Sequence, residues 1–127
     1  MTVFLIDDNS MYLQVTKQRL KPHVDQVFVF SSYRDALNNA ELKPDIIFLD
    51  YLFDSNEING ATIVNKIMKL NPQQKIVIVS GQESGDVVHN LVKLGIRDYI
   101  VKEGNYIEEM ISVIKDYKNR IEQNEKV

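Results

Sequence analysis

The stretch VFLIDD at residues 3–8 contains the pattern that decides the fold of this chain. Four apolar residues, three of them β-branched or aromatic, run without interruption into two acids. Continuous apolar runs of this length are typical of strands that are covered on both faces, as in a parallel sheet, whereas a strand with one wet face alternates. The stretch therefore predicts a buried parallel strand that ends at a pair of carboxylates.

Runs of the same kind occur four more times along the chain, at residues 27–30, 46–49, 76–79 and 99–101. The segments between them place apolar residues at helical spacing, most clearly over residues 107–121. Strand and helix therefore alternate five times. This alternation predicts an α/β fold, a (βα)5 doubly wound sheet of five parallel strands with helices on both faces.

The ends of the helices are predicted from capping residues. Ser10 is expected to cap the first helix. The second helix is expected to begin after Ser31 or Ser32 and to run to about residue 42. Gly95 is expected to close the fourth helix, because glycine readily adopts the left-handed conformation found there.

Composition excludes several classes of protein. The chain has 127 residues, a length that suits one domain, here residues 1–122 with a polar tail at 123–127. Its 15 basic and 18 acidic residues give a net charge of −3, which removes bulk electrostatic attraction to nucleic acid or to an anionic membrane. The absence of cysteine excludes disulfides and thiolate chemistry, and no apolar run is long enough to cross a bilayer. With no signal-peptide pattern at the N-terminus, a cytoplasmic location is expected.

Chemically active side chains follow four of the five runs. They are Asp7, Asp8, Asp50, Ser80 and Lys102. Because the carboxyl ends of parallel strands meet at one edge of a sheet, these side chains are expected to converge. Three neighbouring carboxylates repel one another unless a cation lies among them, and hard oxygen ligands suit Mg²⁺. One carboxylate can attack phosphorus, while a hydroxyl and an ammonium can bind phosphoryl oxygens.

The five residues and their spacing resemble the receiver domain of two-component response regulators, of the single-domain kind found in the chemotaxis receiver. The interval from Asp50 to Ser80 is 30 residues, and that from Ser80 to Lys102 is 22. The resemblance extends from residue 3 to about residue 121. It implies the flavodoxin-like strand order 2-1-3-4-5 for the predicted sheet.

The resemblance also implies a role for each carboxylate. Asp50 corresponds to the phospho-acceptor of the family. Asp8 corresponds to a direct ligand of Mg²⁺, and Asp7 to a residue that acts on the metal through water. Asp50 and the backbone carbonyl of Leu52 would complete the protein's share of the metal ligands.

Further positions correspond to residues that bind or respond to the phosphoryl group. Ser80 corresponds to the switch hydroxyl, and Lys102 to the ammonium that pairs with the acyl phosphate. Tyr99 corresponds to the aromatic switch residue, which turns inward when the Ser80 side moves. Leu52 and Gln82 lie where they would meet the water that hydrolyses the acyl phosphate. Because leucine offers no hydrogen bond and can shield the phosphorus, a long-lived phosphorylated state is expected.

The chain departs from the family in the loops around the site. Glu103 stands where the family usually has a proline behind a cis bond, so the geometry of the preceding peptide bond is open. The loop after the acceptor lacks the usual proline and reaches Gly60 two residues later than usual. It also holds Asp54 and Glu57, which are interpreted as solvated acids, with outer contact to the metal as the alternative.

Together these features predict a phosphorylation-activated signalling receiver rather than a turnover enzyme. Its expected donor is the phosphohistidine of a sensor histidine kinase or of a phosphotransfer protein. Its expected output is a downstream protein that binds the face made by the fourth helix, the fifth strand and the fifth helix. A homodimer linked to phosphorylation is a further alternative, whereas direct contact with nucleic acid or a membrane is not expected.

Three other functions use related chemistry or a related fold. A Mg²⁺-dependent phosphatase with an aspartate nucleophile needs a second aspartate two residues on, where this chain has Leu52. A flavodoxin-like electron carrier needs a phosphate-binding loop after the first strand, where Asp7 and Asp8 would repel the flavin phosphate. A receiver fold that signals without phosphorylation is disfavoured by the full set of site residues.

Overall fold

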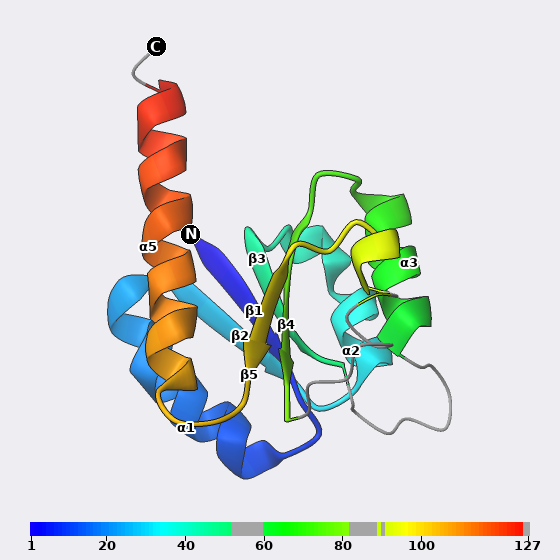
Figure 1. Ribbon diagram of the computed structural model, residues 1–127, viewed down its shortest axis with the longest axis horizontal. Coiled ribbons are helices and arrows are strands. Elements are labelled where there is room, and N and C mark those ends of the chain that lie inside the picture. Colours follow the sequence, from blue (N-terminus) through cyan, green and yellow to red (C-terminus); the bar gives the residue numbers. More distant parts are fainter. Residues whose placement is uncertain (52–59, 82–88, 90, 126–127) are drawn as a thin grey trace.

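The five apolar runs form strands, and the described residues assemble them into one sheet. A computed structural model describes residues 1–51, 60–81, 89 and 91–125. The strands are β1 (Thr2–Ile6), β2 (Gln26–Phe30), β3 (Ile46–Asp50), β4 (Lys75–Ser80) and β5 (Asp98–Val101). All neighbours are parallel and the order is β2-β1-β3-β4-β5, so the predicted fold class and strand order are confirmed (Figure 1).

Helices cover both faces of this sheet (Figure 1). They are α1 (Ser10–Leu20), α2 (Tyr33–Asn38), α3 (Gly60–Leu70) and α5 (Tyr106–Glu125), with short 3-10 turns η1 (Lys21–His23) and η2 (Ala40–Leu42). A further helical stretch before β5 is described at residues 89 and 91–93. Across the described ranges, no helix combines the length and the apolar character that a membrane span requires.

Alternate residues of each strand enter two separate cores. In β1, Val3 and Leu5 pack in the core beneath α1 and α5, whereas Phe4 and Ile6 pack on the opposite face beneath α2 and α3. All four are at most 3% exposed. Because helices cover both faces, neither set of positions can be polar, which is why the runs do not alternate.

The first helix is capped by Asn9, not by Ser10 as expected. The Asn9 side chain accepts hydrogen bonds from the backbone N–H groups of Met11 at 3.0 Å and Tyr12 at 3.2 Å, and Ser10 is the first helical residue. Asparagine and serine are nearly equivalent caps. The earlier start follows from Asp7, whose Oδ1 accepts the Asn9 N–H at 2.9 Å and turns the chain before Ser10.

The second helix begins where it was expected but ends earlier. Its cap is Ser32, whose hydroxyl oxygen accepts the N–H of Asp35 at 3.1 Å. The helix ends at Asn38, and the chain continues as the 3-10 turn η2 rather than as helix to residue 42. The Asn39 side chain donates to the backbone carbonyl of Asp35 at 2.7 Å, and this local bond competes with continued helical hydrogen bonding.

Gly95 closes the helical stretch before β5, as predicted. It has a φ of +91°. Its N–H donates to the carbonyl of Val92 at 3.0 Å, and the N–H of Ile96 donates to the carbonyl of Leu91 at 3.0 Å. Leu91 and Ile96 are buried together, as is usual for this type of helix end.

The last helix, α5, extends to Glu125, into the stretch 123–127 that was expected to be a polar tail. Residues 106–125 contain no glycine or proline to end the helix, and polar residues continue it without a loss of backbone hydrogen bonds.

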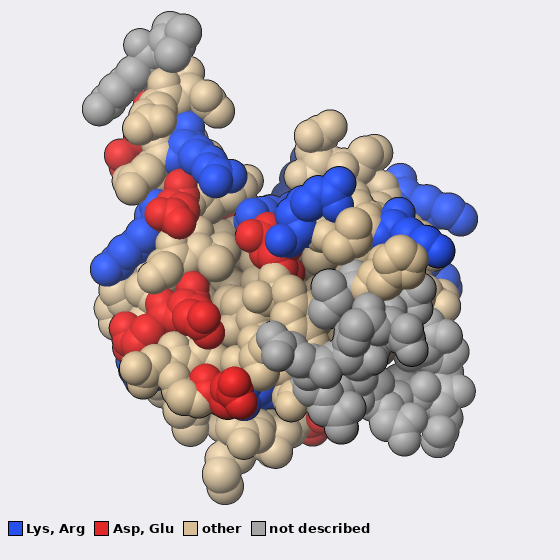
Figure 2. Space-filling model, in the orientation of Figure 1, with Lys and Arg blue, Asp and Glu red and all other residues tan. Residues whose placement is uncertain are grey.

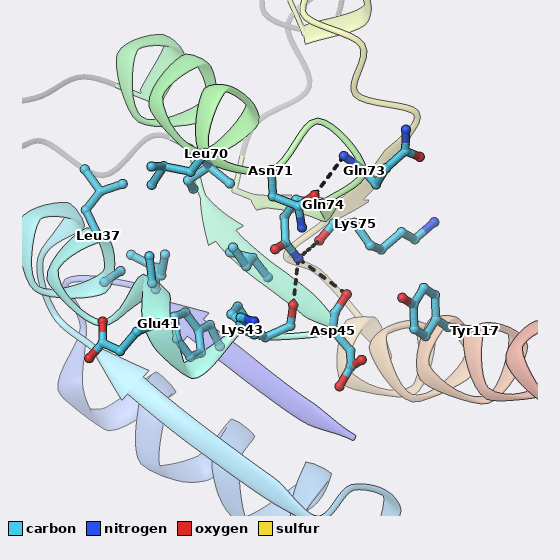
Figure 3. Close-up of a pocket in the computed structure, with 17 residues that line it drawn as sticks. Leu37, Glu41, Lys43, Asp45, Leu70, Asn71, Gln73, Gln74, Lys75 and Tyr117 are labelled. Carbon is cyan, nitrogen blue, oxygen red and sulfur yellow. Dashed lines mark hydrogen bonds between the residues drawn. The ribbon is translucent and has the colours of Figure 1, made fainter.

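A hollow of about 630 Å³ lies at the amino edge of the sheet, between α2 and α3 (Figure 3). Gln74 lines it, and its side-chain amide donates to the carbonyls of Pro44, Asp45 and Lys75 at 3.1, 3.4 and 3.2 Å. These bonds join the starts of β3 and β4. The hollow is therefore at the opposite edge of the sheet from the residues that follow the strands.

Candidate functional site

The strand pattern itself directs three of the predicted site residues to one place. Asp7, Asp50 and Lys102 each lie two positions after a residue that is buried in the core beneath α1 and α5. Because side chains two apart in a strand lie on the same face, these three are carried to the α1 and α5 side of the carboxyl edge. A small cavity of about 30 Å³ between the sheet and these helices is lined by all three.

The structure brings the predicted charged residues together. One carboxylate oxygen from each of Asp7, Asp8 and Asp50 lies within 4.8 Å of the others. The Lys102 Nζ is 2.5 Å from Asp7 Oδ2 and 3.4 Å from Asp50 Oδ2. The side chains of Lys102, Asp7 and Asp50 are only 16, 11 and 12% exposed, whereas Asp8 is exposed. The convergence predicted from the strand ends is therefore observed for all four residues.

Ser80 and Tyr99 lie on the two strands beside this cluster. Ser80 is the last residue of β4 and is fully buried, and its backbone carbonyl accepts the N–H of Lys102 at 2.7 Å. Tyr99 lies on β5, an edge strand of the sheet, and its half-buried side chain packs against the core beneath α2 and α3. The peptide bond between Lys102 and Glu103, left open by the sequence, is trans.

Four predicted residues lie outside the described part of the chain. They are Leu52, Asp54, Glu57 and Gln82. Their expected roles near the metal and the hydrolytic water therefore remain predictions from the sequence.

Burial and like charge together change the acidity of the site. Burial raises the pKa of Asp50 to about 6. The ammonium of Lys102 partly offsets the effect of burial, whereas the Asp7 carboxylate raises the pKa further. Burial lowers the pKa of Lys102, but the hydrogen bond to Asp7 and the charge of Asp50 outweigh this effect, so the net shift is upward. The lysine therefore stays protonated at neutral pH.

The cluster fits a hard divalent cation. Three ionised carboxylates and one ammonium leave an excess of negative charge, and the oxygens are close enough to share one ion. Carboxylate oxygens with room for water are the ligands that Mg²⁺ prefers.

Two tyrosines near the site were not identified from the sequence. The Tyr33 hydroxyl, on the first residue of α2, donates to the backbone carbonyl of Asp50 at 2.6 Å, and Tyr33 is 1% exposed. Burial and the neighbouring acids, Asp50 first among them, raise the pKa of Tyr33 well above its usual range, so the hydroxyl remains a donor. The ring of Tyr12, on α1, lies 5.0 Å from the Lys102 Nζ. No sequence motif marks either contact.

A known protein family matches this chain over most of its length. The model of the response regulator receiver domain matches residues 3–115. The chain belongs to this family. Receiver domains of response regulators are signalling domains of two-component systems, so the resemblance seen in the sequence is confirmed.

Individual relatives agree with this assignment. The chain is 30% identical over 102 residues to chemotaxis protein CheY of Thermotoga maritima, and the match covers 79% of this chain and 83% of that protein. It is 28% identical over 120 residues to response regulator protein VraR of Staphylococcus saprophyticus, covering 92% of this chain and 56% of that one. A receiver domain structure from Clostridium thermocellum has the same fold, with a TM-score of 0.81 at 23% identity over 96% of this chain and 97% of that one. The chain thus spans most of this CheY but only about half of VraR.

The raised pKa of Asp50 predicts that Asp50→Asn stabilises the metal-free protein. A carboxyl whose pKa rises from 3.8 to about 6 on folding contributes stability that is complete below pH 4 and is lost as the pH rises to about 6. A shift of this size corresponds to about 3 kcal/mol in a fully buried group, and partial contact with solvent reduces this to about 1–2 kcal/mol. Urea unfolding in EDTA should therefore show a more stable variant at pH 7.5 and no difference near pH 4.

The exposed Asp116 on α5 supplies the matched control. Asp116→Asn should leave the free energy of unfolding within about 0.5 kcal/mol of wild type at both pH values. An Asp50→Asn variant that is less stable than wild type at pH 7.5 would show that the folded state does not disfavour the ionised carboxylate.

Proposed function

We propose that the protein is a phosphorylation-activated receiver in which Asp50 accepts a phosphoryl group from a phosphohistidine. A sensor histidine kinase or a phosphotransfer protein supplies that group. The observation that carries the proposal is the position of the Asp50 carboxylate, beside the Lys102 ammonium and two further acids at the carboxyl edge of the sheet. Membership of the receiver family supports it.

In the proposed reaction an oxygen of ionised Asp50 attacks phosphorus. The phosphorus–nitrogen bond of the donor breaks, and its imidazole leaves and takes up a proton. With a pKa of about 6, Asp50 is mostly ionised at neutral pH and available as the nucleophile. The Lys102 ammonium and the Ser80 hydroxyl then bind oxygens of the new acyl phosphate, which concentrates positive charge where negative charge arrives.

The proposal assigns Mg²⁺ to the acidic cluster. Asp8 and Asp50 would hold it directly, Asp7 through water, and the Leu52 carbonyl would complete the protein ligands. When bound, the ion supplies charge neutralisation for the phosphoryl oxygens. The short distances among the three carboxylates support this assignment.

Output is proposed to run through the face made by the helix before β5, β5 itself and α5. The bond from the Lys102 N–H to the Ser80 carbonyl links the ends of β4 and β5, so a shift at Ser80 also moves the start of the next loop. Tyr99, half-buried on β5, would turn inward in response. Figure 2 shows acidic side chains over the amino-terminal part of α5, whose first turn carries Glu108 and Glu109. Glu108 is ion-paired with Arg19 of α1, so it does not by itself mark this face for a basic partner.

The remaining features of the proposal concern the setting of the protein. Residues 1–122 are proposed to act as the receiver unit, in the cytoplasm and without direct contact to nucleic acid or membrane. The net charge of −3 supports the last point. A homodimer that forms on phosphorylation is compatible with the same output face.

Incubation with Mg²⁺ and acetyl phosphate should add one phosphoryl group to the protein, detected by intact mass and located at Asp50. Asp50→Asn should take up none. Asp8→Ala should slow uptake by about a hundredfold or more, because a bound metal ion is worth several kcal/mol in such transfers. Asp116→Ala, an exposed change on α5, should react as wild type does. Uptake by Asp8→Ala at the wild-type rate would disprove the metal assignment, and no uptake by wild type would favour a receiver that signals without phosphorylation.

Phosphorylation should change amide chemical shifts mainly at residues 80–102 and in α5. The expected cause is the movement of Ser80 and Tyr99, and a difference of about 1.4 kcal/mol between two packings already changes their ratio tenfold. Two-dimensional NMR before and after addition of acetyl phosphate provides the measurement. Changes confined to α1 and α2 would contradict the proposed output face.

The acyl phosphate should be long-lived because Leu52 cannot assist water. Leu52→Asn should shorten its lifetime by about tenfold, a small part of the 10²–10⁴ that full general-base assistance supplies. Leu52→Ala should also shorten it by opening access to the phosphorus. Leu52→Met, which keeps the bulk, should behave as wild type in a dephosphorylation time course. If neither the asparagine nor the alanine variant loses phosphate faster, the lifetime is set elsewhere, with Gln82 as the next position to change.

A further inference from the structure

The ammonium of Lys102 has a third contact besides its two carboxylates. Its Nζ lies 5.0 Å from the centre of the Tyr12 ring, within the range of a cation–π interaction. Tyr12 is 47% exposed, so its ring lies at the surface of the molecule, while the lysine side chain is 16% exposed. The ring is therefore a partly exposed neighbour of a largely buried ammonium at the edge of the site.

Asp7, which binds Lys102, is also linked through Asn9 to the backbone of Tyr12. Asp7 accepts two hydrogen bonds, one from the Lys102 ammonium at Oδ2 and one from the backbone N–H of Asn9 at Oδ1. Asn9 in turn caps α1 and accepts the N–H of Tyr12 at 3.2 Å. The contact of the Tyr12 ring with Lys102 closes this chain of contacts. The cap thus ties the start of α1, and with it the backbone of Tyr12, to the carboxylate that holds the ammonium.

The two carboxylates hold Lys102 unequally. The ammonium is 2.5 Å from Asp7 but 3.4 Å from Asp50, so in the unphosphorylated protein it is bound mainly to Asp7. Binding an oxygen of a phosphoryl group on Asp50 would shift the ammonium toward Asp50, with a further N–H donor still free to stay on Asp7. An aromatic face attracts a cation without competing for its hydrogen bonds, so the attraction of the ring persists throughout this shift.

We propose that Tyr12 is a positioning residue that holds the Lys102 ammonium over the Asp50 carboxylate through the face of its ring. The inference rests on the proposed function, because it assigns Tyr12 an effect on transfer of the phosphoryl group to Asp50. It also makes an independent statement about the free protein, namely that the ring and the ammonium are in contact. The proposal predicts that the rate of Asp50 phosphorylation depends on the electron density of the ring face and not on the tyrosine hydroxyl.

A set of replacements at position 12 separates these effects. Tyr12→Phe keeps the ring face, 3,4,5-trifluorophenylalanine keeps the ring shape but withdraws electrons from its face, and Tyr12→Leu removes the ring. Met11→Leu is the matched control, since Met11 is on the same turn of α1 and is 75% exposed. The first readout is the initial rate of Asp50 phosphorylation by acetyl phosphate with Mg²⁺. The second is the chemical shift of the Lys102 ε-methylene protons in the free protein, which an aromatic face moves upfield.

Tyr12→Phe and the Met11 control should be phosphorylated at close to the wild-type rate. The leucine and trifluorophenylalanine proteins should be slower by about two- to fivefold, the range expected for a partly exposed cation–π contact. The upfield shift should be present in wild type and Tyr12→Phe and lost in Tyr12→Leu.

Three results would overturn the proposal. A trifluorophenylalanine protein as fast as Tyr12→Phe would show that the ring acts only by its shape. An ε-methylene shift that is the same in wild type and Tyr12→Leu would show that the contact does not exist. A wild-type protein that accepts no phosphoryl group would remove the proposed function and with it the effect of Tyr12 on transfer, while the methylene shift would still decide whether the ring holds Lys102.

Discussion

The site depends on one ammonium, that of Lys102, which faces a group of acids at the carboxyl edge of the sheet. Parallel strands bring these acids together because the carboxyl ends of all the strands lie at the same edge of the sheet. Without the ammonium, partly buried carboxylates would repel one another with little solvent to screen them. Burial first, and the Asp7 carboxylate in addition, raise the pKa of Asp50, and the ammonium only partly offsets these two effects. An excess of negative charge that the protein itself does not neutralise is what makes the edge suited to cations and to phosphoryl chemistry.

Much of this arrangement could be predicted from the sequence, because strand position and strand parity are properties of the chain alone. The apolar runs located all the strands of the described sheet, and the residues after them located the charged cluster. The predictions failed where two local bonds of similar strength compete. Asn9 and Ser10 are equally good caps, and Asp7 selects the first of them through a bond that the sequence does not reveal. The early end of α2 has the same kind of origin, since the Asn39 side chain competes with the helix backbone.

The contacts of Tyr12 and Tyr33 could not be predicted for a different reason. Helical spacing indicates which face of a helix is apolar, but not how far the helix slides along the sheet or which rotamer a side chain adopts. A hydrogen bond of 2.6 Å or a ring 5.0 Å from a cation depends on both. Such contacts join elements that are distant in the chain, and their residues follow no spacing rule. They emerge only when the packed structure is known.

One consequence follows from the hydrogen bond between Tyr33 and the Asp50 carbonyl. Asp50 is held at two points, its backbone carbonyl by Tyr33 of α2 and its carboxylate by Lys102 just after β5. A change of charge on the carboxylate therefore meets a backbone that is already anchored. If the proposed phosphorylation occurs, the displacement that follows is expected in less restrained neighbours rather than in the Asp50 backbone. In mechanical terms, Asp50 is expected to act as a fixed support, with motion at the groups that contact it.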